Sequence, residues 1–380
     1  MDLSLASQYL GQLPAGFDQS IWAQYSTRKT AAIIGDFNRT ALEAPWEANA
    51  TDSSLRAAND FLNTTDFVAF DPSFFNLIGS EARVEHVWNP ANTTIHEASC
   101  FIPELNSLYF ASWGFNHDWQ FLLNATTNEV KQITTDPPVI NAHGCQMYNG
   151  SLYITTDGGG GTYASVVKVD PLTWKSEVIL NNFYQQPFRG FNDLDIDPQG
   201  NIWMTDSSSA WSNSLTDFAP ATSPAVYFLN MTTRAAKWLF ESQGNVNGIA
   251  YGPSGTLYVD VTDISSGRPK VLDPTESRAL WSFDTRGGRP QLHDQVLFSN
   301  PISRYYDGVR VSRNGYVWAA SGDGLDVIEP VDGTVIGRVR VGGGAFAPVN
   351  VAFEDHVLWI VGKGGVWKVD GVKERLARDW

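Results

Sequence analysis

Polar residues able to bind a cation or to move a proton recur at one place in five successive segments of the chain, about ten residues before a short apolar–aromatic pattern. The stretch RGFNDLDIDPQGNIWMTDSS, residues 189–208, shows the feature clearly, because a strand of alternating apolar residues opens on Asn192-Asp193. Strands normally avoid Asn and Asp, so these side chains need a reason. The set comprises Glu97, His143, Asn192, Asn247 and Asp307, with Asn350 as a looser sixth match.

Two carboxylates and two amides are groups that suit Ca²⁺, a hard cation that takes about 6–8 oxygen ligands. Without a cation, two converging carboxylates would repel, and one would tend to stay protonated. The imidazole of His143 titrates nearest neutrality, so it could move a proton beside a metal-bound substrate or serve the structure alone. A single Asn or Asp could also cap a turn beside a glycine, as in Asn247-Gly248 and Asp307-Gly308. The shared register in five segments favours one common site.

A repeated strand pattern predicts how these residues are positioned. A turn followed by an apolar–aromatic–apolar–small strand occurs six times, at intervals of 41 to 60 residues between equivalent positions. This spacing is typical of one four-stranded sheet per repeat, and it predicts an all-β, six-bladed β-propeller. Because the innermost strands of a propeller line a central channel, the polar residues are expected to converge on its axis. The marker residues are Leu108, Leu152, Ile202, Leu257, Val317 and Leu358.

The repeats also predict the domain organisation. Residues 1–66 match no repeat and are expected to form an irregular N-terminal arm, with the propeller over residues 67–380. The segment DFVAFDPSFFNLIG, residues 66–79, is expected to supply a strand that closes the ring against the last blade, since an open ring leaves two exposed edges.

Composition limits the partners and the compartment. The formal net charge of −15 argues against a nucleic acid or an anionic membrane as partner. The start of the chain lacks the features of a signal peptide, yet seven Asn-X-Ser/Thr sequons predict a secreted glycoprotein whose signal was replaced by a start Met. The sequons are at Asn38, Asn49, Asn63, Asn92, Asn124, Asn149 and Asn230.

The two cysteines, Cys100 and Cys145, permit one disulfide, because they fall on neighbouring predicted blades. They lie three residues after Glu97 and two residues after His143. That difference in parity points their side chains to opposite faces unless a bulge intervenes, so the bond stays open at this point.

The repeats resemble the calcium-dependent lactonase propellers: the gluconolactonase/regucalcin family, its secreted fungal lactonohydrolase branch and, more distantly, the paraoxonases. The resemblance lies in HEASCFIPELNSLYF, FNDLDIDPQGNIWMTD, VNGIAYGPSGTLYV and YYDGVRVSRNGYVWAASGDG. It implies that Ca²⁺ is held at Glu97, Asn192, Asn247 and Asp307, and that Asp307 matches the carboxylate usually assigned as general base. The segment INAHG around His143 is similar to one with a catalytic histidine in paraoxonases, whereas fungal lactonohydrolases tend to have Asn there.

Three functions are compatible with these observations. The first, which we expect, is a Ca²⁺-dependent lactone hydrolase acting on a small molecule, in which Asp307 or His143 activates water. The second is a natural-product cyclase, since some fungal members of the family promote hetero-Diels–Alder closure, here of an apolar polyketide or terpenoid. The third is a non-enzymatic interaction propeller, which requires an exposed apolar patch on one face.

Overall fold

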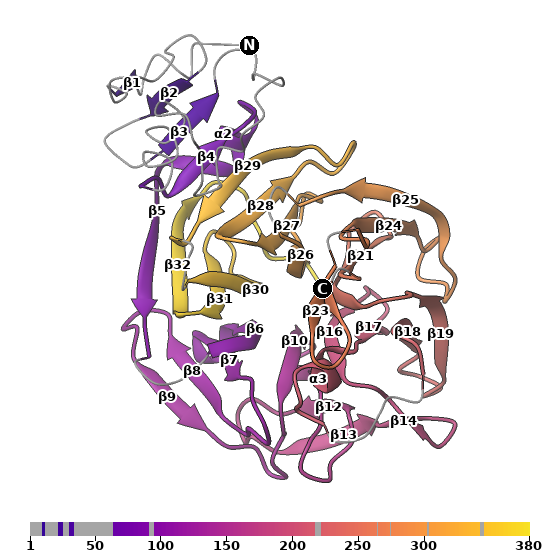
Figure 1. Cartoon of the computed structure of the whole chain (residues 1–380). Coiled ribbons are helices and arrows are strands. Elements are labelled where there is room, and N and C mark those ends of the chain that lie inside the picture. The colour runs from indigo at the N-terminus through magenta and orange to yellow at the C-terminus, as the bar shows by residue number, and fades with distance from the viewer. Residues whose placement is uncertain are drawn as a thin grey trace.

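The computed structural model describes residues 64–90, 95–216, 222–263, 265–273, 275–301, 304–342 and 346–380, together with the backbone of 10–11, 22–25 and 30–33. Six blades of four strands each surround a central axis like a propeller, and the sheet of the fifth blade is extended to eight strands (Figure 1). The predicted all-β, six-bladed fold is therefore confirmed.

Each blade is an antiparallel sheet whose strands run outward from the axis in chain order, except that the outer strand of the sixth blade, β5, comes from before the first blade. The first two blades are β6 (Ile95–Ile102), β7 (Ser107–Ser112), β8 (Gln120–Asn124) and β9 (Val130–Ile133), then β10 (Ala142–Tyr148), β11 (Ser151–Thr156), β12 (Ser165–Val169) and β13 (Ser176–Leu180). The next two are β16 (Phe191–Ile196), β17 (Ile202–Asp206), β18 (Ala225–Leu229) and β19 (Ala236–Glu241), then β20 (Val246–Tyr251), β21 (Thr256–Val261), β24 (Leu280–Asp284) and β25 (His293–Ser299). The last two are β26 (Tyr306–Val311), β27 (Val317–Ser321), β28 (Gly324–Ile328) and β29 (Val335–Arg340), then β30 (Ala347–Phe353), β31 (Leu358–Lys363), β32 (Gly365–Val372) and β5 (Ile78–Trp88).

An N-terminal strand closes the ring. Strand β5 precedes the first blade in sequence and pairs antiparallel with β32 of the sixth blade. The prediction for residues 66–79 was wrong in its strand: that segment forms β4 (Phe67–Ala69), which pairs with β29 of the fifth blade, and a short helix, α2 (Phe74–Leu77). The strand that closes the ring, β5, begins only at Ile78, so it includes just the last two residues of the predicted segment. Because a strand from before the first blade completes the last blade, hydrogen bonds within one sheet hold the two ends of the propeller together.

Three short strands extend the sheet of the fifth blade beyond β4. They are β1 (Leu10–Gly11), β2 (Trp22–Tyr25) and β3 (Thr30–Ile33), and β3 runs parallel to β4. Most of residues 1–63 lies outside the described part of the chain, so the boundary between 1–66 and 67–380 stays a prediction. The same applies to the sequons at Asn38, Asn49, Asn63 and Asn92.

The hydrophobic core lies between neighbouring blades. Each repeat places its aromatic residue on the second strand of a blade, where the ring packs in the layer shared with an adjacent blade. All six rings are buried: Tyr109, Tyr153, Trp203, Tyr258, Trp318 and Trp359. The repeated aromatic that reveals the fold in the sequence is thus the residue that holds one blade to another.

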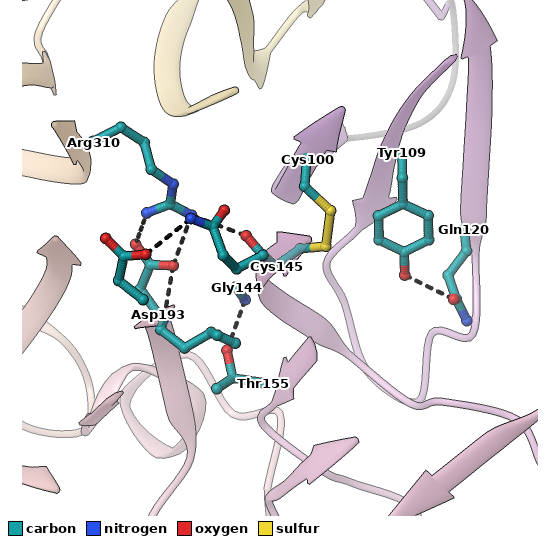
Figure 2. The surroundings of a disulfide bond; sticks show 11 residues. Cys100, Tyr109, Gln120, Gly144, Cys145, Thr155, Asp193 and Arg310 are labelled. Atoms are coloured by element: carbon teal, nitrogen blue, oxygen red, sulfur yellow. Dashed lines mark hydrogen bonds and ion pairs between the residues drawn. A yellow bond between two sulfur atoms is a disulfide. The ribbon is translucent and has the colours of Figure 1, made fainter. Parts of the chain in front are cut away.

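A disulfide joins the inner strands of the first two blades. Cys100 on β6 and Cys145 on β10 are bonded, with their Cα atoms 5.7 Å apart (Figure 2). The register of β6 shifts between Glu97 and Cys100, and Ala98 has a positive φ of 61°. This bulge adds one residue to the strand and removes the difference in parity, so both sulfurs face each other.

Candidate active site on the propeller axis

Every inner strand carries an irregularity at its polar ring residue. The pairing of inner and second strand shifts register at this point in all six blades, as a β-bulge does. A bulge adds a residue to one strand and re-aims its side chain. Asn192-Asp193 opens a strand because both residues lie within such a bulge, between Phe191 and Leu194. The six residues at these shifts are Glu97, His143, Asn192, Asn247, Asp307 and Asn350, which we call the axial ring.

Glycines after three ring residues let adjacent inner strands approach each other. A Cβ on Gly248 would lie 2.3 Å from the carbonyl oxygen of Asp307, and one on Gly308 would lie 2.7 Å from that of Val349. A Cβ on Gly144 would lie 2.7 Å from Asp193 Cα. Each glycine thus serves the contact with the next blade. None of the three has a positive φ, so the turn-capping alternative does not account for them.

Four members of the axial ring contact one another directly. The Nε2 atom of His143 lies 3.2 Å from Glu97 Oε1 and 3.1 Å from Asn192 Nδ2. Asn350, the looser sequence match, donates from Nδ2 to Glu97 Oε2 at 3.3 Å. The blades therefore bring an imidazole, a carboxylate and two amides into one buried group.

Asn247 and Asp307 complete the ring on the fourth and fifth blades. The side chain of Asn247 lies beside the carboxylate of Asp307, and Asp307 interacts electrostatically with both His143 and Glu97. Asp307 is half-buried, while Glu97 and Asn247 are buried. The partly open carboxylate lies beside a small cavity of about 30 Å³ formed by the fifth and sixth blades.

Two residues that the sequence did not single out hold His143 in place. Asp157, just after β11, accepts a hydrogen bond at Oδ2 from His143 Nδ1 at 2.6 Å, and Trp113 Nε1 also donates to this oxygen. The ring centroids of Trp113 and His143 are 5.3 Å apart. Asp157 therefore fixes the ring orientation and leaves Nε2 directed toward the axial ring.

A repeat of aspartates could have indicated Asp157. The motifs TTD, MTD and VTD at the ends of three second strands place Asp157, Asp206 and Asp263 at the same end of their blades, within two residues of a common register. Asp206 accepts the backbone N–H groups of Arg189 and Gly190, and Asp263 accepts those of Gly244 and Asn245. These two clamp the loop that enters their own blade. Asp157 Oδ2 serves His143 and Trp113 instead, and this departure from the pattern marks it as part of the site.

Burial and charge shift the protonation of the axial ring. Burial raises the pKa of Glu97 to about 8; His143 opposes the shift, and Asp307 adds to it. Burial also raises the pKa of Asp307, against the attraction of His143. Burial lowers the pKa of His143, but Asp157 and Glu97 outweigh it and hold that pKa well above its usual value. The two ring carboxylates thus need nearby positive charge to ionise together.

The donor set fits a hard divalent cation. Asn247 Oδ1 is buried with no hydrogen-bond partner in the described part of the chain, which leaves an acceptor oxygen for a ligand. Within the same residues no group of three or more His, Cys, Asp or Glu side chains is arranged for a metal. An ion here would accordingly combine amide with carboxylate oxygens, as Ca²⁺ does.

Asp260 on β21 is a further buried carboxyl that the sequence analysis missed. Neither of its oxygens has a hydrogen-bond partner among the described residues. Burial, then the charges of Asp307 and Asp263, raise its pKa well above the usual value. A protonated Asp260 adds no negative charge beside Asp307.

A layer of ion pairs lies directly below the axial ring. Asp193 receives both terminal nitrogens of Arg310, at 2.7 and 3.0 Å (Figure 2). Asp195 receives those of Arg378 from the C-terminal tail, at 2.8 and 2.5 Å. A separate cavity of about 460 Å³ lies at the other ends of the inner strands, lined in part by Arg310, Arg378 and Trp380. The ion pairs separate this cavity from the axial ring.

The six blades and the polar ring on their axis make this chain a six-bladed β-propeller protein. Comparison with known proteins shows to which family of propellers it belongs. The model of the SMP-30/Gluconolactonase/LRE-like region matches residues 117–361. The chain belongs to this family, which confirms the predicted resemblance.

Two similar proteins are named as a lactonohydrolase and a gluconolactonase. The chain is 27% identical to the lactonohydrolase oryL of Aspergillus oryzae (strain ATCC 42149 / RIB 40) over 369 residues, covering 90% of this chain and 81% of that protein. It is 27% identical over 200 residues to a gluconolactonase of Zymomonas mobilis subsp. mobilis, covering 50% of this chain and 51% of that protein.

Solved structures share the fold. A gluconolactonase of Xanthomonas campestris superposes with a TM-score of 0.66 at 20% identity, over 80% of this chain and 93% of that chain. The calcium-binding protein regucalcin of Agrobacterium tumefaciens str. C58 gives a TM-score of 0.59 at 15% identity, over 78% of this chain and 96% of that chain.

Proposed function

We propose that this protein is a Ca²⁺-dependent lactone hydrolase whose reaction takes place at the axial ring. The observation that carries the proposal is the buried Asn247 Oδ1 atom, which has no hydrogen-bond partner among the described residues and lies beside two carboxylates and an Asp157–His143 pair. The lactonohydrolase and gluconolactonase relatives support the reaction, and the regucalcin neighbour supports a divalent metal. The substrate is a small cyclic ester.

Glu97, Asn192, Asn247 and Asp307 would hold the cation. When bound, Ca²⁺ supplies a Lewis acid that polarises the lactone carbonyl and balances the ring carboxylates. Asn350, which donates to Glu97 Oε2, orients that carboxylate. The bulges keep these side chains on rigid inner strands, which limits the geometry that a substrate can adopt.

His143 is the group best placed to activate water. A bound cation would repel the proton on the imidazole and neutralise Glu97, and would so lower the raised pKa of His143. With Asp157 holding its Nδ1 atom, Nε2 could then take a proton from a water molecule that attacks the acyl carbon. The C–O bond to the ring oxygen then breaks, and His143 returns the proton to that oxygen. The product is a hydroxy acid, which releases one proton at neutral pH. Asp307 is a metal ligand and the second candidate base in this scheme.

The cyclase alternative gains no separate support among the described residues. A natural-product cyclase would position two reactive groups by pocket shape and would need no water-activating pair. The Asp157–His143 hydrogen bond favours the hydrolase.

We also propose passage through the secretory pathway. The Cys100–Cys145 bond suits an oxidising compartment, and the sequon residue Asn149 is exposed. The described residues contain no helix of the length and hydrophobicity that would span a membrane.

The test is hydrolysis of a lactone panel by the purified chain, followed as proton release in a pH-stat. We expect turnover of at least one lactone, loss of that activity with a chelator, and recovery with added Ca²⁺. Failure to hydrolyse any lactone, combined with chelator-insensitive cyclisation of a diene-type substrate, would overturn the proposal in favour of the cyclase.

A further inference from the structure

The mouth of the axial site carries an excess of positive charge that the proposed hydrolysis does not use. Arg304 and Lys363 line the small cavity beside Asp307, from the fifth and sixth blades. Lys270 approaches from the fourth blade and interacts electrostatically with Asp307, Lys363 and Arg304. Three cations from three blades thus gather at one opening of a protein whose net charge is −15.

None of these three cations forms an ion pair within 4.0 Å with a carboxylate of the described residues. The buried cations of the propeller behave differently: Arg310 and Arg378 each bind an aspartate with both terminal nitrogens. If Ca²⁺ balances the two ring carboxylates, the charge of the three cations at the mouth remains uncompensated. Uncompensated charge beside a concave site attracts and orients ligands of opposite sign.

Lys270 is presented by a hairpin inserted into the fourth blade. The hairpin of β22 (Ser265–Ser266) and β23 (Val271–Leu272) interrupts the fourth blade between β21 and β24 and reaches toward the centre of the ring (Figure 1). Arg268 fastens it to the third blade by donating to Thr216 O at 3.1 Å and by lying 5.9 Å from the ring centroid of Trp211. The hairpin thereby holds an ammonium group over the site.

We propose that the lactone substrate carries a second, anionic group, a carboxylate, that binds at Lys270, Arg304 and Lys363. This inference rests on the proposed hydrolysis and narrows its substrate class to lactones of carboxylic acids. The carbonyl would lie at the axial ring and the carboxylate at the mouth, so the cations select the substrate and orient it. A carboxylate also matches the hydrogen-bond donors available, because guanidinium and ammonium groups bind it through charge-assisted bonds.

The test compares two lactones that differ only in charge: γ-butyrolactone with a ring carboxylate and the same ring with a carboxamide. The purified full chain with Ca²⁺ should show a kcat/KM at least about 10-fold higher for the carboxylate, mostly through KM. Raising the salt concentration should reduce this preference, because ions screen the exposed cations.

Variants show whether the mouth causes the preference. Lys270→Gln and Lys363→Gln should each reduce the carboxylate-to-carboxamide ratio by about 5- to 10-fold. The matched control is Lys131→Gln, because Lys131 is exposed on β9, the outer strand of the first blade, away from the axis. This variant should leave the ratio unchanged. A ratio near one in the unaltered protein, or an equal loss with both substrates in the variants, would overturn the inference.

A second readout separates this inference from the proposed function. If neither lactone is hydrolysed, the hydrolase proposal fails, and binding of the two compounds is measured by titration calorimetry instead. Tighter binding of the carboxylate that is lost in Lys270→Gln still supports an anion site at the mouth. Equal binding of both compounds, or binding of neither, refutes it.

Discussion

The axial ring and the layer of ion pairs below it come from the same inner strands, yet they differ in how their polar groups are satisfied. On β16, Asn192 belongs to the ring, whereas Asp193 and Asp195 bind Arg310 and Arg378 with both oxygens. In the ring, Asn247 Oδ1 has no hydrogen-bond partner within the described ranges, and burial raises the pKa of Glu97. Satisfied buried charges seal and stiffen the propeller, while incompletely satisfied ones mark the place where a ligand binds.

Replacement of His143 should give the largest effect if the ring is the reacting layer. His143→Gln removes the base but keeps a polar side chain of similar reach, so lactone hydrolysis should fall about 10²–10⁴-fold. The unfolding midpoint should change little by comparison. Steady-state kinetics and thermal melting check this, and a variant with unaltered kcat/KM would remove His143 from the mechanism.

Breaking the layer below should damage stability more than it damages chemistry. Asp193→Asn leaves the buried guanidinium of Arg310 without its counter-charge, so the free energy of unfolding should fall by about 3–5 kcal/mol. The matched control is Asp284→Asn, whose partner Arg286 lies 3.5 Å away at the surface, and which should cost less than about 1 kcal/mol. Denaturant titration compares them; equal losses would contradict the distinction.

Removal of the disulfide should have an intermediate effect, because it links two inner strands next to both layers. The bond closes a loop with a sequence separation of 45, and the double change Cys100→Ser, Cys145→Ser should cost about 2–4 kcal/mol. Urea titration of the variant and the oxidised native protein measures the difference. A variant as stable as the native protein would show that the blades hold β6 and β10 without it.

The smallest effect is expected at the C-terminal tail that carries Arg378. Burial raises the pKa of Glu374 to about 7, and its carboxyl contacts the hydroxyl of Ser312. Because the folded state holds a proton that the unfolded chain loses near pH 4.5, stability should fall as pH rises from about 4.5 to 7. Glu374→Gln should flatten this part of the pH profile. An unchanged slope would assign the pH dependence to other groups.

Much of the architecture was predictable because it depends on local pattern. The repeated strand with its buried aromatic, such as Trp203 or Trp318, fixes both the number of blades and the layer between them. The residue types of the axial ring and their shared register were equally visible in the sequence. The strand that closes the ring was misplaced by one element, because the apolar segment FVA forms β4 on the fifth blade. The closing strand β5, IGSEARVEHVW, mixes apolar with charged residues, and only its tertiary pairing identifies it.

The unpredicted part of the site depends on bulges and on contacts between blades. A bulge adds one residue without a distinct sequence signal, so the facing of Cys100 and Cys145 could not be decided. Asp157 looks identical in sequence to the clamping residues Asp206 and Asp263. Only the neighbouring His143, brought close by the fold, gives it a different partner.

A Ca²⁺ titration of metal-free protein, with lactone hydrolysis followed in the same samples, tests the central claim most directly. We expect one Ca²⁺ per chain at the ring and activity that rises in step with its occupancy. Asp307→Asn should lose both together, since it removes a ligand and its charge. Full activity without Ca²⁺, or unchanged Ca²⁺ affinity in Asp307→Asn, would contradict the assignment of the axial ring as a metal-dependent hydrolytic site.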